Sequence, residues 1–251
     1  MGALHPGHIS LISQARREND LVVCSIFVNP TQFNNADDFK LYPVSIAADI
    51  EMLIQAGCDV LFLPAVEEIY PDHYQAKKYE LGDIEKVLEG AFRPGHFQGV
   101  CQVVDRLVTI VAPDKMYLGQ KDFQQCMVIH RLLEIENKKQ EVELVISPTM
   151  RENDGLAMSS RNLRLNPVQR NAAKIIYEVL KSIRDQWHEK SIDQLKSEGR
   201  KKLEDAGFIV DYVEIADQHN LRPAGEKDPS PVALIAASIG GIRLIDNLIL
   251  N

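Results

Sequence analysis

Apolar and polar positions alternate in two distinct ways along the first two thirds of the chain. Nearly continuous apolar runs, typical of strands buried on both faces of a parallel sheet, occupy residues 21–28, 60–63, 116–118 and 142–146. Segments with helical periodicity lie between them, and the clearest are residues 9–18, 45–56, 100–111 and 123–135. This alternation predicts a Rossmann-like α/β fold, with a parallel sheet, right-handed crossovers and helices on both faces.

Three shorter segments are less regular. Residues 64–79 are rich in turn formers and predict a loop that could include an edge strand. Residues 84–88 predict a short helix, and residues 92–97 predict a loop that carries Arg93 and His96.

The order of helical and strand patterns changes after Asn162. Helical periodicity returns over residues 168–188 and 192–206, and strand patterns follow at residues 208–215, 232–239 and 242–249. Gly240-Gly241 predicts a tight hairpin between the last two strands. Helices followed by antiparallel strands predict a small α+β domain over residues 163–251, beside a larger domain over residues 1–162.

Composition and net charge limit the kinds of partner that this chain is expected to bind. The chain has 251 residues, 45% of them hydrophobic, and a formal net charge of -8, which disfavours a nucleic-acid partner but leaves room for a small anion in a local basic pocket. No apolar run reaches the roughly 18 residues needed to span a bilayer. The cysteines lack any Cys-x-x-Cys spacing and are Cys24, Cys58, Cys101 and Cys126. We therefore expect a cytoplasmic protein with reduced thiols and no membrane partner.

The first ten residues hold the strongest candidate chemistry. His5 and His8 stand three residues apart at the start of the first amphipathic segment, so both would project from one side of a helix N-terminus. Such a helix end attracts anions, and a phosphate group is the expected ligand. The alternative is a pair of surface histidines at a frayed terminus. No protein metal site is predicted, because further zinc ligands do not follow at the usual spacing.

Other polar groups follow predicted strands and would gather at the same edge of the sheet. Asn29 and Gln32 follow the first strand, Gly119 to Asp122 close the third, and Ser159 to Arg161 lie in the loop after the fourth. Lys121 and Arg161 offer charge for phosphate, although the spacing is not that of a Walker loop. The alternatives are a solvated lysine at a helix start and, for the segment around Ser159, a capping stretch ahead of the next helix. Asn166-Pro167, an N-cap residue followed by proline at the first helical position, is the better prediction for that cap.

Six motifs, in order along the chain, resemble those of the pantoate–β-alanine ligase family. They read MGALHPGH, FVNPTQF, RPGHF, GQKDFQQ, DGLAMSSRN and RLIDN. The family belongs to the nucleotidyltransferases related to class I aminoacyl-tRNA synthetases, and the first and fifth motifs are similar to their HIGH and KMSKS signatures.

The resemblance implies ATP-dependent condensation of pantoate with β-alanine through pantoyl adenylate, with Mg²⁺, in pantothenate and coenzyme A biosynthesis. It also implies a cytoplasmic homodimer. Catalytic roles would fall to His8, His5, Lys121 and Arg161. The matching ATP contacts are Met1, Gly2, Ala3, Leu4, His5, Pro6, Gly7, His8, Gly119, Gln120, Lys121, Asp122, Met150, Met158, Ser159, Ser160 and Arg161. The matching substrate contacts are Gln32, Gln125, Asn29 and Arg93.

Two departures from the family pattern leave alternatives open. The family normally has a helix and a buried strand ahead of the first motif, whereas this sequence begins at Met1, and Gln120 stands where the family often has Glu. One alternative is an inactive nucleotide-binding remnant that lacks the first strand. Another is a related adenylyltransferase, which would release pyrophosphate without AMP. Arg93 could instead form a surface ion pair, and His96 is predicted to be structural.

Overall fold

The computed structural model describes residues 2–33, 39, 43–225 and 228–250. Met1, a predicted ATP contact, lies outside this range. The chain divides into two compact units, one formed by Met1–Gly119 with Gln124–Pro148 and the other by Gln120–Phe123 with Thr149–Asn251. The sequence places the boundary after Asn162, whereas this grouping divides the chain after Pro148 and adds the short segment around Lys121 to the second unit.

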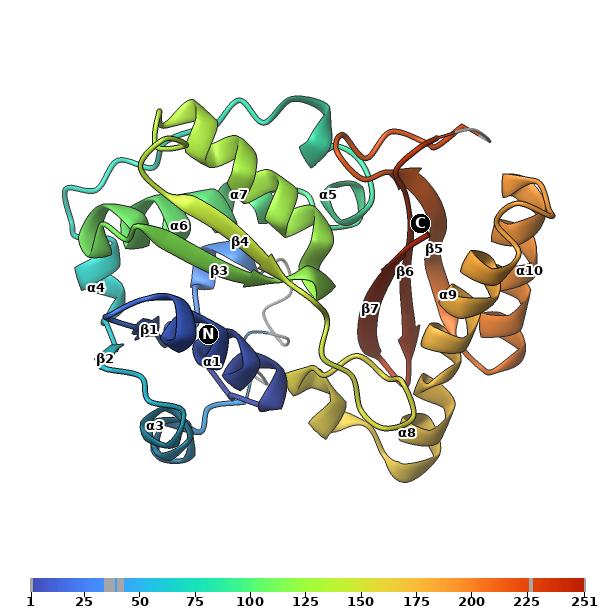
Figure 1. The fold of residues 1–251 in the computed structure, drawn as a ribbon, viewed down its shortest axis with the longest axis horizontal. Coiled ribbons are helices and arrows are strands. Elements are labelled where there is room, and N and C mark those ends of the chain that lie inside the picture. The colour runs from blue at the N-terminus through green and yellow to red at the C-terminus, as the bar shows by residue number, and fades with distance from the viewer. Residues whose placement is uncertain (1, 34–38, 40–42, 226–227, 251) are drawn as a thin grey trace. The chain divides into compact units, whose positions relative to one another are not determined.

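The first unit contains two pairs of parallel strands (Figure 1). β1 (Val23–Ser25) pairs with β2 (Val60–Phe62), and β3 (Lys115–Gly119) pairs with β4 (Glu143–Ser147). Parallel pairing between helices confirms the predicted α/β class. Among the described residues, ladder hydrogen bonds join these strands two by two, whereas the sequence predicts one continuous sheet.

Helices connect and cover these strands. Their bounds are α1 (Pro6–Glu18), α3 (Ile46–Gln55), α4 (Val66–Ile69), α5 (Glu89–Phe92), α6 (His96–Val111) and α7 (Phe123–Ile135), with 3-10 turns η1 (Pro30–Gln32) and η2 (Gly82–Glu85). Buried apolar faces hold them in place. Ile12 and Ala15 of α1 pack with Cys24 of β1, while Phe97 of α6 packs with Val128 of α7.

Four local predictions in this unit need correction. The strand predicted over residues 21–28 is paired only at Val23–Ser25. Residues 64–79 contain α4 rather than an edge strand. The helix predicted at residues 84–88 is replaced by the 3-10 turn η2, which ends at Glu85, and by α5, which begins at Glu89. Helix α6 begins at His96 rather than near residue 100, because Gly95, with φ of 82°, turns the chain directly into the helix.

The second unit is an antiparallel sheet with helices. β5 (Ile209–Asp217), β6 (Pro231–Ile239) and β7 (Ile242–Ile249) lie in that order, and Gly240 and Gly241 form the predicted hairpin with φ of 56° and 76°. Both angles are positive, as a type I′ turn requires.

The helices of this unit are α8 (Pro167–Ala173), α9 (Ile175–Asp185) and α10 (Ile192–Asp205), and a 3-10 turn, η4, spans Ser160–Arg164. Asn166 caps α8 as predicted, since its side chain accepts a hydrogen bond from the Gln169 amide at 2.9 Å. The helix predicted over residues 168–188 is instead divided at Lys174. Leu180 of α9 and Leu203 of α10 pack on the sheet beside them (Figure 1), in one apolar cluster with Val213 of β5 and Ile235 of β6.

Nowhere in the described part of the chain is there a helix with the length and apolar character that a bilayer span requires.

Candidate functional site

The two predicted histidines lie at the N-terminus of α1. His5 is the N-cap residue, with extended φ and ψ, Pro6 is the first helical residue, and the His5 carbonyl accepts the amide of His8 at 2.8 Å. The rings of His5 and His8 stack with centroids 3.9 Å apart. Both imidazoles therefore share one side of a helix end where the helix dipole favours an anion.

A buried carboxylate fixes the backbone that leads into these histidines. Asp49 of α3 is 1% exposed and accepts the amide of Ala3 at 2.9 Å, the amide of Leu4 at 2.8 Å and the hydroxyl of Ser45 at 2.9 Å. Ala3 adopts φ of 47°, which costs a residue with a Cβ. The carboxylate thus stabilises a strained turn directly before His5, a role that the sequence reading missed.

The turn after β1 presents Gln32 through a set of supporting contacts. Asn29 is 2% exposed, accepts the hydroxyl of Tyr70 at 2.9 Å, and donates to the carbonyl of Gly99 at 3.1 Å and to Gln32 Oε1 at 3.3 Å. His96 Nδ1 lies 2.8 Å from the Gln32 carbonyl, which makes Nδ1–H the donor. Asn29 and His96 therefore shape the turn, and the side-chain amide of Gln32 is its candidate ligand-binding group.

Gly99 allows this turn to lie directly against α6. A Cβ built on Gly99 would lie 2.4 Å from the carbonyl oxygen of Thr31 and 2.9 Å from the Cα of Gln32. Real Cβ atoms do not approach other atoms so closely. Glycine at this position is thus required for the observed placement of Gln32.

The remaining predicted substrate residues lie on α7 and on the connection before α6. Arg93 Nη1 is 3.6 Å from Glu89 Oε2, so it forms the ion pair that the alternative reading predicted. Gln124, 3% exposed, accepts the Glu89 amide at 2.9 Å and donates to two carbonyls of the η2–α5 segment. Gln125 is half-buried in the first turn of α7. Gln124, which the sequence reading passed over, therefore supports the segment that carries Arg93.

The second unit brings three predicted phosphate ligands to one small cavity. Lys121, Ser159 and Arg161 line a cavity of about 20 Å³ together with Asp246. A space of this size holds about one water molecule, so it marks where these side chains meet. Lys121 Nζ lies 3.1 Å from the partly exposed carboxylate of Asp122.

Residues 149–162, the 149–162 loop, contain a small hairpin closed by an antiparallel bridge between Arg151 and Ala157 and continue into the first residues of η4. The Met158 amide donates to the Met150 carbonyl at 2.9 Å, so the two predicted nucleotide contacts are neighbours through their backbones. Ser159 is the N-cap of η4, since its side chain accepts the Arg161 amide at 3.3 Å, and Ser160 is buried. Ser159 therefore caps the 3-10 turn η4, whereas the cap of the next α-helix is Asn166.

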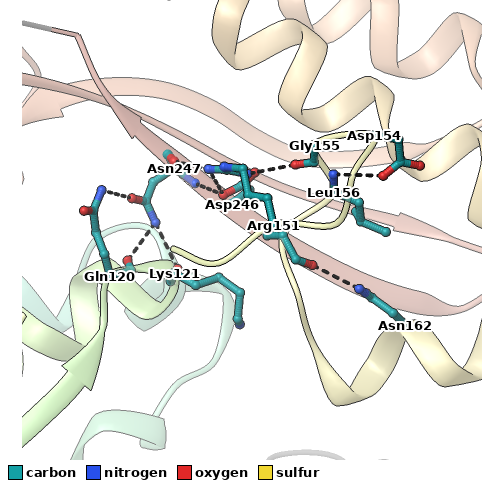
Figure 2. Close-up of polar contacts among 10 residues, drawn as sticks. Gln120, Lys121, Arg151, Asp154, Gly155, Leu156, Asn162, Asp246 and Asn247 are labelled. Atoms are coloured by element: carbon teal, nitrogen blue, oxygen red, sulfur yellow. Dashed lines mark hydrogen bonds and ion pairs between the residues drawn. The ribbon is translucent and has the colours of Figure 1, made fainter. Parts of the chain in front are cut away.

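Strand β7 contacts both the Lys121 segment and the 149–162 loop (Figure 2). Asn247 is 1% exposed and donates to the carbonyls of Gln120 and Lys121, each at 2.9 Å. Asp246 is bound by both terminal nitrogens of Arg151 at 2.5 and 3.0 Å. Burial raises the pKa of the Asp246 carboxyl, and the hydrogen bonds from Arg151 oppose that rise.

One cysteine lies beside a candidate residue, since Cys126 Sγ donates to the carbonyl of Gly119 at 3.6 Å. Cys24, Cys101 and Cys126 are buried and Cys58 is half-buried. Burial raises the pKa of Cys24 to about 11 and that of Cys101 to about 12, so neither thiol provides a nucleophile near neutral pH.

The predicted residues therefore fall into two sets, each described within its own unit. The first unit holds His5, His8, Gln32, Arg93 and Gln125, and the second holds the Lys121 segment with Ser159 and Arg161. Gly119 ends β3, as predicted. The supporting residues share one feature, which is a long separation in sequence from the group they hold. They are Asp49, Gly99, Gln124, Asp246 and Asn247.

A sequence model of the pantoate-beta-alanine ligase family matches residues 1–249. The pantothenate synthetase of Pseudomonas fluorescens (strain Pf0-1) is 45% identical over 254 residues, which cover 100% of this chain and 88% of that protein. That of Fervidobacterium nodosum is 42% identical over 253 residues, covering 100% and 89%.

Solved structures give the same result. The crystal structure of pantothenate synthetase from Thermus thermophilus matches with a TM-score of 0.94 and 40% identity, over 100% of this chain and 91% of that one. Pantoate-beta-alanine ligase from Francisella tularensis, complexed with beta-gamma ATP and beta-alanine, matches with a TM-score of 0.84 and 38% identity, over 100% and 87%. These matches confirm the resemblance read from the six motifs and give no support to the inactive alternative.

Proposed function

Because this chain belongs to the pantoate–β-alanine ligase family, we propose that it condenses pantoate with β-alanine to pantothenate in an ATP-dependent, AMP-forming reaction. The observation that carries the proposal is the family match over residues 1–249, which includes every motif with candidate chemistry. The Francisella relative binds an ATP compound and β-alanine, which supports the same ligand classes here.

The reaction has two transfers. In the first, a carboxylate oxygen of pantoate attacks the α-phosphorus of ATP, the bond from that phosphorus to the bridging oxygen breaks, and pyrophosphate leaves. In the second, the uncharged amine of β-alanine attacks the acyl carbon of pantoyl adenylate, AMP leaves with the electron pair of the broken bond, and the nitrogen loses a proton. Both transfers need positioning and charge neutralisation more than a protein nucleophile.

The phosphates of ATP are bound by side chains that donate hydrogen bonds or carry positive charge. His5 and His8 donate hydrogen bonds from the N-terminus of α1, and His8 is the proton donor toward the leaving phosphate. Lys121 supplies a point charge and Arg161 a bidentate guanidinium, while Ser159 and Ser160 add hydroxyl donors.

The amides of Gln32 and Gln125 hold pantoate, whose hydroxyl groups both donate and accept hydrogen bonds. Asn29 acts mainly through Gln32, because its own amide is buried and bonded to protein groups. Arg93 attracts a substrate carboxylate to the same region while it remains paired with Glu89.

Magnesium is expected to bind together with ATP. In the described residues no group of three or more His, Cys, Asp or Glu side chains is placed to hold a metal ion. That fits Mg²⁺, which usually binds substrate phosphates with one or two carboxylates and several waters. Asp122, beside Lys121, is the carboxylate we assign to it, and the ion would neutralise charge on the phosphates.

We further propose that the enzyme works in the cytoplasm as a homodimer. Reduced, buried cysteines fit a reducing compartment. Family membership supports the dimer, and sedimentation of the purified chain tests it directly.

The test is to measure pyrophosphate and AMP after mixing the purified chain with ATP, magnesium and pantoate, with and without β-alanine. We expect stoichiometric pyrophosphate without the amine and sustained AMP formation only with it. Lys121→Ala is the matched control and should lower both signals strongly, to a small but measurable residual rate. Pyrophosphate release without AMP in the presence of β-alanine would identify an adenylyltransferase, and ATP binding without either product would indicate an inactive protein.

A further inference from the structure

We propose that Asn247 and Asp246 of β7 are positioning residues that fix Lys121 and the 149–162 loop relative to one another for phosphate binding. The proposal rests on the function proposed above and assigns a role to the closing RLIDN motif, whose chemistry that function does not use.

Asn247 controls the backbone on which Lys121 stands. Its Nδ2 donates to the carbonyls of Gln120 and Lys121, each at 2.9 Å, and its Oδ1 accepts from Gln120 Nε2 at 3.1 Å. The side chain is 1% exposed, so these bonds form away from water. Two consecutive peptide groups are thereby fixed, which sets the direction in which the Lys121 side chain leaves the turn.

Asp246 controls the 149–162 loop through Arg151. The guanidinium binds both carboxylate oxygens of Asp246, then reaches the Gly155 carbonyl at 3.1 Å and the Asn247 carbonyl at 3.2 Å. Its carbon also lies 4.0 Å from the ring centroid of Tyr177. Arg151 is therefore held by several partners at once, and it ties the tip of the loop to β7.

Adjacent positions of one strand direct their side chains to opposite faces. Figure 2 shows the consequence, with Asn247 directed toward Gln120 and Lys121 and Asp246 directed toward Arg151. Two phosphate-binding segments that are about 30 residues apart in sequence thus share a single rigid support. The cavity lined by Lys121, Ser159, Arg161 and Asp246 shows independently that these segments meet.

The contacts of Asp246 and Asn247 also leave the positive charges of Lys121 and Arg161 available for phosphate. Asn247 is neutral, and the Asp246–Arg151 pair compensates its own charge. A buried ion pair contributes little net stability but is costly to break, which suits residues that hold other residues in position. The positive charge offered to ATP therefore remains that of Lys121 and Arg161.

A double-mutant cycle tests this role. Asn247→Ala is combined with Lys121→Ala, and pantoate-dependent pyrophosphate release is measured for all four proteins. We expect Asn247→Ala alone to raise the KM for ATP and lower kcat by about 10-fold or more, with the KM for β-alanine unchanged. In the Lys121→Ala background we expect Asn247→Ala to cause little further loss, because its effect passes through Lys121.

Val213→Ala is the matched control for stability. It removes two methyl groups from the 3%-exposed core position of the same unit, so it should lower the melting temperature without changing the KM for ATP. If Asn247→Ala does not fold, the isosteric Asn247→Asp keeps the volume while losing both donors, and the same cycle applies.

Fully additive losses, or a wild-type KM for ATP in Asn247→Ala, would overturn the proposal while leaving the ligase function intact. A wild-type chain that releases no pyrophosphate with pantoate would instead refute the proposed function, and this inference with it.

Discussion

Replacing Gly99 by alanine should damage pantoate binding more than it damages the fold. The new Cβ would lie 2.4 Å from the Thr31 carbonyl oxygen, and contacts below 3.0 Å essentially never occur. The turn at η1 must therefore move by about 0.6 Å or more, because both clashing groups are backbone and cannot rotate away. The same movement stretches the bond from Asn29 to the Gly99 carbonyl, now 3.1 Å long.

The effect on stability is small because two contributions oppose each other. Overpacking typically costs about 1–3 kcal/mol, whereas replacing glycine by alanine inside a helix contributes up to about 1 kcal/mol. We therefore expect a net loss of roughly 0–2 kcal/mol in the free energy of unfolding. A displacement approaching 1 Å at a substrate contact can reduce turnover by about 100-fold. The kcat/KM for pantoate should accordingly fall by about 10- to 100-fold.

Gly199→Ala provides the matched control in α10. There the Cβ would lie 3.0 Å from a Val179 methyl group and 3.3 Å from a Val213 methyl group, so the clash is with side chains that can adjust. We expect a comparable change in melting temperature with an unchanged KM for pantoate. A Gly99→Ala enzyme with wild-type kcat/KM for pantoate would refute the assignment of Gln32 and the turn to this substrate.

Three further predictions concern the first unit. Asp49→Asn should raise the KM for ATP about 10-fold and lower the free energy of unfolding in urea by roughly 1–3 kcal/mol. The reason is that the new NH2 group would face the backbone amide of Ala3 or Leu4, and two donors cannot bond to each other. Unchanged kinetics would contradict this. Native Cys24 and Cys101 should resist thiol reagents at pH 8, because at most about one molecule in a thousand carries either thiolate. Burial raises the pKa of Cys24 from 9.0 to about 11, so its protonated thiol stabilises the fold below pH 9 and that contribution is lost as the pH rises through 11. Rapid labelling of either thiol before unfolding would refute the assignment.

Elements with a strong local signal were predicted well. Gly240-Gly241 between two apolar runs marked the β6–β7 hairpin, and Asn166 with Pro167 marked the start of α8. Elements that depend on distant partners were predicted less well. β1 is paired over three residues because its length depends on which neighbour supplies hydrogen bonds, and apolar composition does not encode that. The start of α6 was placed too late because Pro94-Gly95 resembles a loop.

The same contrast between local signals and distant partners holds for the candidate site. Residues whose own chemistry suits phosphate can be proposed from sequence, since imidazole, ammonium and guanidinium groups at a helix start or after a strand are able to bind anions. Residues that act on distant backbone groups carry no such mark. Asp49 lies 45 residues from the Leu4 amide that it binds, and Asn247 lies 126 residues from the Lys121 carbonyl. Only the presence of RLIDN among the family motifs signalled that Asn247 belongs to the site.

Two of the supports act mainly on the main chain. Asp49 accepts the backbone amides of Ala3 and Leu4 before His5, and Asn247 donates to the backbone carbonyls of Gln120 and Lys121, so neither bonds to the side chain of His5 or Lys121. A buried polar group bonded to the backbone resists displacement, because moving it would strand donors or acceptors away from water. Charge and geometry are therefore supplied by different residues. Loss of Lys121 removes one of the two positive charges, whereas loss of a supporting residue moves a charge that is still present. Added salt should therefore weaken ATP binding more steeply in the second class than in the first.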